Sequence, residues 1–282
     1  MHLSIRKKDS VTSILLFIFN VFLVERGITS LPLKKIFRIT EPFRKNETAV
    51  RMGLSRGVQN GLLSREKKDG EVFYSITGEA AKGVRHWQET LSEYRKRIPL
   101  QLSGWDGEWS ILHWRAHTDK NSAAAFTEAV IQVGYGVLGS GLWVSPFNFT
   151  ERMEKVAEEC GIEIFQFRGT PSGGRTSMET AQKAWPLLGK LAQRYSSLEK
   201  SIAEELNELD PNSINCGAGL PLLHKLGLEF FEVIQDDPQL PLELLPPEWP
   251  GPRVARSFMG TRESILPETR SFIQKILSVT YE

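Results

Sequence analysis

The side chains best suited to chemistry in this chain lie between residues 46 and 74, where hydrogen-bonding groups repeat at helical spacing. At about 100° per residue, one face of a helix over this stretch is mostly polar. It carries Thr48, Met52, Ser55, Arg56 and Gln59, with Arg51 on its flank. Arginine and glutamine donors form hydrogen bonds with base edges, and hydroxyl groups contact bases or phosphates. This face therefore favours contact with DNA.

The sequence around this face predicts a helix with clear ends. Asn46 is a good N-cap, and Glu47 places a negative charge in the first turn. Gly61 ends the helix as a C′ glycine does. The opposite face forms an apolar stripe that would pack on a core, made of Val50, Leu54 and Val58.

A basic hairpin is predicted directly after the helix. Residues 62–66 and 71–74 read as strands, and Asp69-Gly70 between them is a strong signal for a two-residue turn. A polar helix followed by a basic hairpin is the layout of a winged helix-turn-helix, in which the helix reads bases and the wing touches phosphates. An ordinary surface helix and hairpin is the alternative. The residues predicted to contact DNA are Arg44, Lys45, Thr48, Arg51, Ser55, Arg56, Gln59, Arg65, Lys67 and Lys68.

The charge distribution agrees with a DNA-binding N-terminal part. Residues 1–100 hold 19 Lys+Arg and 10 Asp+Glu, net +9, whereas the rest of the 282 residues carry net −8, so that the whole chain has a formal charge of +1. A basic domain suits a polyanion, and an acidic remainder does not. Cys160 and Cys216 provide neither a disulfide framework nor a zinc pattern, which predicts free thiols in a reducing cytoplasm.

An apolar stretch near the start resembles a signal peptide. Arg6-Lys7-Lys8 precedes the mostly apolar residues 11–24. Such a helix would span about 21 Å, too short for a hydrocarbon core of about 30 Å, and no small-residue cleavage site follows. We expect a buried first helix over residues 10–25 and a cytoplasmic protein with no membrane partner. A membrane-tethered binding protein is the alternative.

The remaining elements indicate an α+β protein. We predict a second helix over 30–39 with Ser30 as cap and Pro32 in its first turn, a helix over 78–94, and a linker over 95–99. A strand at 109–115, a helix at 121–133, one or two strands within 134–146, a helix at 151–160 and a strand at 162–167 suggest a ferredoxin-like sandwich. Later helices are predicted at 178–207, 219–235 and about 265–279, with an ordered proline-rich segment at 238–252. The predicted domains are 1–97, 98–170 and 171–282.

Two glycine motifs match enzyme signatures only formally. Gly53-Leu-Ser-Arg-Gly57 fits a nucleophile elbow, which requires a strand before the serine, but here the match lies inside a helix. We interpret its glycines as residues that allow close helix packing rather than as part of a nucleophile elbow. Gly134-Tyr-Gly-Val-Leu-Gly139 fits a dinucleotide fingerprint but follows a helix and opens a strand, so we interpret its glycines as turn residues with positive φ.

Ligand-binding alternatives remain open in the second half of the chain. His113 and His117 have metal-ligand spacing if helical, although they lie on a predicted strand. The tryptophans of the central region suit either core packing or stacking on an aromatic ligand. Thr170-Pro-Ser-Gly-Gly-Arg-Thr176 precedes a helix, where backbone N–H groups and Arg175 suit a phosphate.

Several separated motifs resemble the PaaX family, bacterial repressors of phenylacetate degradation genes. Residues 46–63 are similar to its recognition-helix segment, and Trp105-Asp-Gly-Glu-Trp109 resembles the opening of its central domain. Further matches are Gly134-Tyr-Gly136, Gly141-Leu-Trp-Val-Ser-Pro146, Leu220-Pro-Leu-Leu-His224, Asp237-Pro-Gln-Leu-Pro241 and Leu244-Leu-Pro-Pro-Glu-Trp-Pro250. The chain departs from the family pattern between Asn20 and Pro32 and in the 170–176 loop.

The resemblance implies an N-terminal winged helix, a central domain similar to Cas2, and a helical C-terminal domain. It also implies a homodimer on a palindromic operator that is released by an aryl-CoA thioester such as phenylacetyl-CoA. We therefore expect a ligand-responsive repressor with no enzymatic activity and no cofactor. The candidate effector contacts are Trp109, Trp143, Arg175 and His224. A metal-dependent nuclease of Cas2 type, using Asp106 and Glu108, is the alternative.

Overall fold

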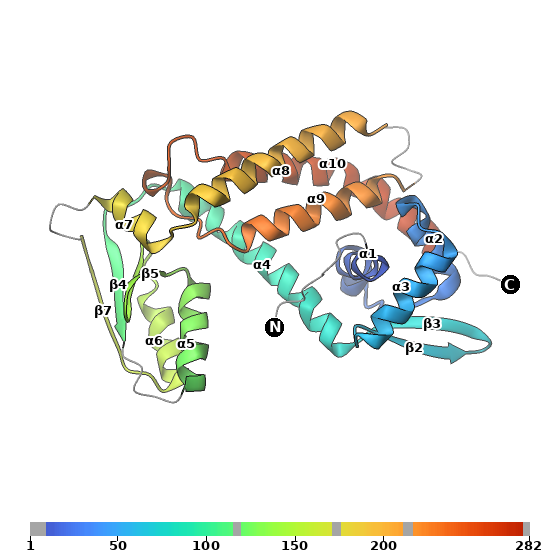
Figure 1. Ribbon diagram of the computed structural model, residues 1–282, viewed down its shortest axis with the longest axis horizontal. Coiled ribbons are helices and arrows are strands. Elements are labelled where there is room, and N and C mark those ends of the chain that lie inside the picture. The colour runs from blue at the N-terminus through green and yellow to red at the C-terminus, as the bar shows by residue number, and fades with distance from the viewer. Residues whose placement is uncertain (1–9, 115–119, 171–175, 211–216, 279–282) are drawn as a thin grey trace. The chain divides into compact units, whose positions relative to one another are not determined.

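The computed structural model describes residues 10–114, 120–170, 176–210 and 217–278, and Figure 1 shows its elements in chain order. Contacts divide the chain into two compact units. The first is built from residues 1–93, 195–235 and 252–282, and the second from residues 94–194 and 236–251. The C-terminal part of the sequence thus contributes to both units.

The first unit is built around an almost wholly apolar helical segment. Helix α1 (Val11–Ile18) begins at Ser10, whose side chain accepts a hydrogen bond from Ser13 N. It continues as the π-helix η1 (Phe19–Leu23) and the 3-10 helix η2 (Val24–Arg26). Because their side chains are apolar on nearly every side, α1 and most of η1 are buried, as the predicted helix over 10–25 required, whereas no residue of η2 is buried. No helix in the described part of the chain combines the length and the hydropathy that a bilayer crossing requires.

The second predicted helix begins later than expected. Residues Ser30–Pro32 form strand β1, and helix α2 (Leu33–Thr40) begins after Pro32, so the prediction that Ser30 caps this helix is wrong. Leu31 pairs with Tyr74 of the hairpin and is buried. Strand pairing and burial at Leu31 outweigh the local capping signal of Ser30.

The helix predicted after Asn46 is confirmed as helix α3 (Glu47–Gln59). The Asn46 side chain accepts a hydrogen bond from Ala49 N at 2.8 Å, and Gly61 adopts φ +69° after the helix end. The apolar stripe is only partly as predicted, because Val58 is 36% exposed and Gly57 is buried instead. At about 100° per residue, Gly57 lies only about 20° from the direction of Val50, whereas Val58 lies about 80° away.

The predicted hairpin is confirmed and gains a third strand. Strands β2 (Leu63–Lys68) and β3 (Glu71–Ile76) pair antiparallel from Leu63↔Ile76 to Lys68↔Glu71, and the sheet order is β1-β3-β2. The two turn residues, Asp69 and Gly70, have φ +51° and +79°, as a type I′ turn requires. The 3-10 helix η3 (Glu41–Phe43) joins α2 to the start of α3.

Helix α4 (Gly78–Leu102) runs through the residues predicted to form a linker. The linker prediction for 95–99 is wrong, because these residues are helical and α4 continues through Pro99 to Leu102. A continuous helix therefore connects residues of the first unit with residues of the second.

The second unit contains a four-stranded sheet in the order β5-β6-β4-β7, and all neighbouring strands are antiparallel. Helices α5 and α6 contact each other and lie beside the sheet (Figure 1). Their apolar residues share a core with Leu112, Trp114 and Trp143 of the sheet. The β-α-β-β-α-β order agrees with the predicted elements. Their bounds are β4 (Trp109–Trp114), α5 (Lys120–Val133), β5 (Gly136–Gly139), β6 (Leu142–Ser145), α6 (Thr150–Cys160) and β7 (Ile164–Gly169).

The C-terminal half is helical as predicted, but with different bounds. The predicted helix over 178–207 is broken after Ala184, and the last helix begins at Gly251 rather than near residue 265. Residues 238–252 are ordered and docked, since Leu240, Leu244 and Trp249 are buried. The elements are α7 (Ser177–Ala184), α8 (Leu188–Glu208), α9 (Gly219–Ile234), η5 (Leu242–Leu244) and α10 (Gly251–Ser278).

Candidate nucleic-acid interface

Helix α3 lies unusually close to α1 because two glycines face the contact. A Cβ added to Gly53 would lie 2.4 Å from Val11 Cβ, and one added to Gly57 would lie 2.7 Å from a methyl group of Leu63. The Thr12 hydroxyl donates a hydrogen bond to the Gly53 carbonyl at 3.2 Å. The interpretation of these glycines as packing residues is confirmed. They fix the position of α3 on the first helix and on strand β2.

We expect Gly53→Ala to destabilise the protein by about 1–3 kcal/mol, because the new methyl group must push α3 away from Val11. This cost exceeds the gain of about 1 kcal/mol that alanine normally brings to a helix. Gly189→Ala in α8 is the control, since no heavy atom lies within 4 Å of its added Cβ. Urea denaturation measures both. A Gly53→Ala variant as stable as the parent would show that α3 is not held by this contact.

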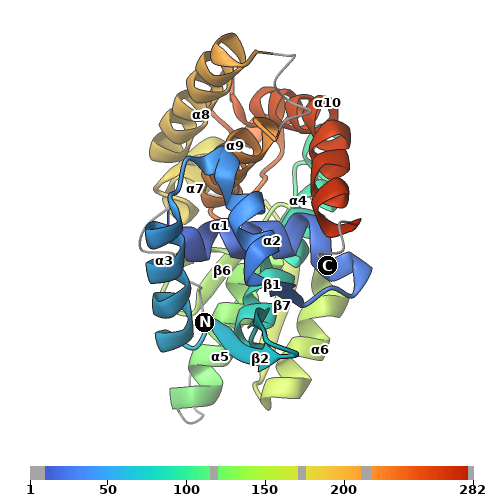
Figure 2. The same ribbon diagram turned by 90° about the vertical axis from the view of Figure 1, so that its right-hand side faces the viewer.

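The outward face of α3 is polar and accessible. Thr48, Ser55, Arg56 and Gln59 are all exposed, and Arg56 makes no ion pair with any described residue. Figure 2 shows α3 at the edge of the first unit with its length open to the viewer. The structure thus brings these four predicted contacts together on one surface. An unpaired guanidinium on such a surface retains its hydrogen-bond donors for an incoming acceptor.

Arg51 lies on the flank of this face and has local partners. Its guanidinium lies 3.7 Å from the Glu47 carboxylate and 5.0 Å from the ring centre of Phe37 in α2. The ion pair is exposed at both ends, so it contributes little stability and competes weakly with a phosphate. The Phe37 ring instead fixes the direction of the side chain.

The hairpin presents cations on the same side as α3. Leu63 points toward α3, where its side chain meets Gly57. Because side chains alternate along a strand, Arg65 and Lys67 share that face of β2, whereas Lys68 lies on the other face beside the turn. All three cations are exposed. Arg65 and Lys67 are therefore placed to reach a ligand that also contacts α3.

The residues leading into α3 provide further cations. Arg44 is exposed and adopts φ +55°, so it directs the chain from η3 into α3, and Lys45 is half-buried. Sequence reasoning left one residue of the outward face of α3, Met52, out of the predicted contacts. Met52 is 51% exposed among the polar residues of α3, and its helical position already indicated this face. A methionine there suits the methyl group of thymine.

Three of the predicted effector contacts, Trp109, Trp143 and His224, are buried. Trp109 is fully buried between Trp105 and Trp185, and Trp143 belongs to the core of the second unit. A ligand would reach either ring only after this core rearranged, so packing explains both residues better than stacking on an effector. Arg175 lies outside the described residues.

His224 has a structural environment within the first unit. Its Nε2 lies 3.0 Å from the Ser13 hydroxyl, and its ring contacts Phe17 and Phe43 edge-on at 5.2 and 5.6 Å. The side chain is buried and joins α9 to α1 and η3. This buried packing explains the presence of His224 without a role in binding a ligand. His117, the predicted partner of His113, lies outside the described residues, and His113 Nδ1 lies 3.0 Å from the Gly141 carbonyl.

The acidic residues of the nuclease alternative form a structural turn. Arg168 Nη2 donates to Asp106 Oδ2 at 2.7 Å, and the Glu108 carboxylate lies 3.5 Å from Arg168 Nε. The Glu108 backbone N–H and then Arg168 hold the pKa of Asp106 below its ordinary value. Both carboxylates are thus engaged with one guanidinium. The described residues contain no group of three or more potential metal ligands.

The glycines of the formal dinucleotide motif have two different roles. Gly134 adopts φ +112°, as the turn interpretation predicted. Gly136 and Gly139 do not. The lack of a side chain at Gly136 instead leaves room for the Trp185 ring, which lies 2.6 Å from where a Cβ would stand. Neither position opens a helix, so the motif is not a phosphate-binding turn.

Three family models match successive parts of the chain. They describe a PaaX-like protein over residues 11–80, the PaaX protein central Cas2-like domain over 102–181, and a PaaX-like protein C-terminal domain over 185–275. The transcriptional repressor PaaX of Escherichia coli strain K12 is 24% identical over 277 residues, covering 94% of this chain and 84% of that protein.

A solved structure shares the fold. An uncharacterized protein from Mycobacterium tuberculosis matches with a TM-score of 0.60 at 21% identity, covering 94% of this chain and 99% of that one. The three family models together account for the N-terminal, central and C-terminal parts in the order of the family. The chain therefore belongs to the PaaX family.

Proposed function

We propose that this protein is a DNA-binding transcriptional repressor whose α3 lies in the major groove of an operator. One observation carries the proposal: the exposed polar face of α3, with the unpaired Arg56, lies on the same side as Arg65 and Lys67 of the hairpin. The residues that would contact base edges or nearby phosphates are Arg51, Ser55, Arg56 and Gln59, with Thr48. The residues that would hold the phosphate backbone are Arg44, Lys45, Arg65, Lys67 and Lys68.

Within this proposal, α1, α2, α3 and the β1-β3-β2 sheet form a winged helix-turn-helix with the hairpin as its wing. The helix order and the short three-stranded sheet support this assignment. The second unit is proposed to be a ferredoxin-like domain, supported by its β-α-β-β-α-β order and by the strand order β5-β6-β4-β7. The E. coli relative carries the name of a transcriptional repressor.

The protein is proposed to act as a homodimer on a palindromic site, and strand β7 offers a surface for the second copy. It is an edge strand of the described sheet, and Phe165 and Phe167 on its outer face are 61% and 58% exposed. Edge strands with exposed apolar side chains favour pairing with another chain. An antiparallel pair of β7 strands would place these aromatic residues of two protomers side by side.

We expect Phe165→Glu/Phe167→Glu to weaken the dimer by about 100-fold or more in dissociation constant, because like charges would meet across the two-fold axis. Sedimentation equilibrium measures the change. Ile131→Glu in α5 is the matched control, since Ile131 is as exposed but lies away from the edge strand. A double variant that remains dimeric would place the interface elsewhere.

The effector is proposed to be an aryl-CoA thioester, with phenylacetyl-CoA as the first candidate, and the regulated genes a phenylacetate-type operon. Family membership supports this choice. The effector would bind one dimer geometry better than another, so that the two α3 helices lose the spacing of about one DNA turn that the operator requires.

A mobility-shift titration on the DNA upstream of its own gene tests the proposal. We expect a saturable complex at concentrations where an unrelated duplex remains free, and release of the complex by phenylacetyl-CoA but not by free CoA. Absence of any sequence preference would refute the repressor assignment. Binding that resists all aryl-CoA thioesters would refute only the effector.

A further inference from the structure

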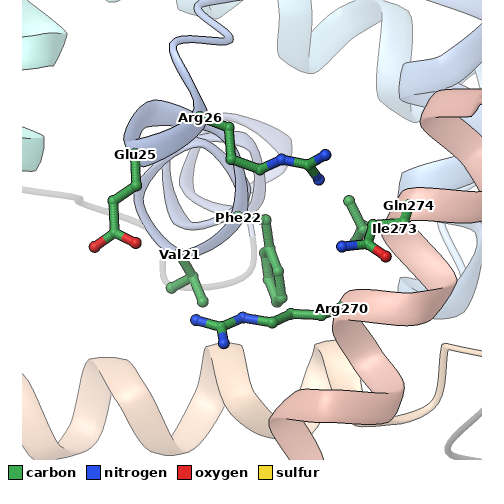
Figure 3. Close-up of a pocket in the computed structure, with 7 residues that line it drawn as sticks. All are labelled: Val21, Phe22, Glu25, Arg26, Arg270, Ile273 and Gln274. Carbon is green, nitrogen blue, oxygen red and sulfur yellow. The ribbon is translucent and has the colours of Figure 1, made fainter.

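The first unit contains a pocket that none of the predicted DNA or effector contacts lines. It has a volume of about 320 Å³ and lies between the end of the first helical segment and the last turns of α10 (Figure 3). Residues 21–26 of η1 and η2 form one wall, and residues 270–274 of α10 form the other. The pocket thus joins segments that are almost 250 residues apart in the sequence but belong to one compact unit.

The lining combines an apolar base with two guanidinium groups. Phe22 and Ile273 are buried, and Val21 adds a third apolar side chain. Figure 3 shows the side chains of Arg26 and Arg270 on opposite sides of the Phe22 ring, and the Gln274 amide on the α10 side.

The two guanidinium groups retain their hydrogen-bond donors. Neither Arg26 nor Arg270 forms an ion pair or a side-chain hydrogen bond with the residues that the structure describes. Glu25, the remaining lining residue, offsets one of the two positive charges. The lining therefore carries a formal charge of +1, which matches a ligand with a single negative charge.

The backbone at this wall is also unusual. Val21 and Phe22 lie in the π-helix η1, whereas the helical segment before it is an ordinary α-helix. A π-turn inserts one residue, which rotates all later side chains by about 100°, and such turns occur frequently at functional sites. Gln88 donates to the Asn20 carbonyl at 3.4 Å and so satisfies one acceptor of the widened turn. The π-turn places Phe22, Glu25 and Arg26 along the pocket.

We propose that this pocket binds a small organic carboxylate with an apolar body, held by Arg26 and Arg270 with Phe22 beneath it. The two guanidinium groups would form charge-assisted hydrogen bonds to the carboxylate, and Gln274 would donate another. The volume lies at the lower end of ligand pockets, which favours a ligand much smaller than a CoA thioester. The inference therefore goes beyond the proposed effector.

A ligand at this place would strengthen the framework that carries α3. It would connect η1 and η2 to α10, and α10 is also joined to α2, because Lys35 Nζ donates to the Leu277 carbonyl at 2.6 Å. Binding to the folded protein raises its stability by mass action. Because both arginines are exposed, we expect binding to weaken as salt is added.

Calorimetric titration of the full chain with benzoate and with hexanoate tests the proposal. Benzyl alcohol, which lacks the carboxylate, and inorganic phosphate, which lacks the apolar body, are the control probes. We expect saturable binding of a carboxylate, weaker by about 10-fold or more in Arg26→Gln and Arg270→Gln. Arg256→Gln is the control, since Arg256 is an exposed arginine of α10 that does not line the pocket. Circular dichroism checks that each variant is folded.

Three results would overturn the inference: no saturable binding of either carboxylate, equal binding by the parent and both arginine variants, or equal binding of benzyl alcohol or phosphate. DNA binding is measured on the same preparations. Carboxylate binding without any DNA binding would refute the proposed function and leave this site intact, and the reverse pattern would refute the site alone.

Discussion

Replacing Arg56 with alanine is expected to lower the affinity for the operator by about 1–3 kcal/mol, or roughly 5- to 150-fold, and to relax the preference at one base pair. Arg56 is exposed on α3 and has no ion-pair partner among the described residues, so its donors are available to a guanine edge. The measurement is a fluorescence-anisotropy titration on a duplex selected from a random pool by the parent protein.

The affinities for duplexes of different sequence distinguish a contact between Arg56 and a base from a contact between Arg56 and a phosphate. At the base pair that Arg56 reads, a single base-pair change in the selected duplex should lower the affinity of the parent more than it lowers the affinity of the variant. Arg85→Ala in α4 removes the same charge from another exposed helix of the first unit and should leave affinity and preference almost unchanged. A uniform loss over all duplexes would assign Arg56 to a phosphate instead.

Removing Arg65 and Lys67 together is expected to weaken binding to all duplexes alike and to reduce the slope of log K against log salt by about 2. Each residue lies on the α3 side of the hairpin, beyond the buried Leu63, where a phosphate contact would release about one counterion. The affinity of the double variant is measured over a series of salt concentrations on the selected duplex and on an unrelated one.

Lys190→Ala in α8 is the control for this charge removal, because it is exposed and belongs to the second unit. Its salt slope should equal that of the parent. An unchanged slope for the Arg65/Lys67 double variant would mean that the hairpin does not touch DNA, even if α3 does.

The elements that matter most for the proposed DNA binding could be predicted because their signals are local. Asn46 caps α3 through its own side chain, and Asp69-Gly70 sets the hairpin turn through its backbone conformation. Helical periodicity likewise placed Ser55, Arg56 and Gln59 on the exposed face. Each of these features depends on residues within about one helical turn of one another.

The elements that were missed depend on partners far away in the sequence. Strand β1 forms because Leu31 meets Tyr74, and α4 continues past Arg95 although its composition resembles a linker. Tertiary packing overrides local propensity at each of these places.

The pocket between η1 and α10 had no signal in the sequence. Its walls are brought together only by folding, and a π-turn over Phe19–Leu23 leaves no recognisable pattern of residue types. Arg26 and Arg270 are ordinary surface residues when the sequence is read alone. Their relation appears only when both are seen beside Phe22 (Figure 3).

The most direct measurement compares operator binding by the parent and by the Arg51→Ala/Arg56→Ala double variant, at one salt concentration and with both proteins shown to be folded. If the outward face of α3 lies in the major groove, the double variant should bind the selected duplex about 100-fold or more weakly, approaching its affinity for unrelated DNA. Equal affinity of the two proteins for the selected duplex would contradict the assignment of α3 as the DNA-reading helix.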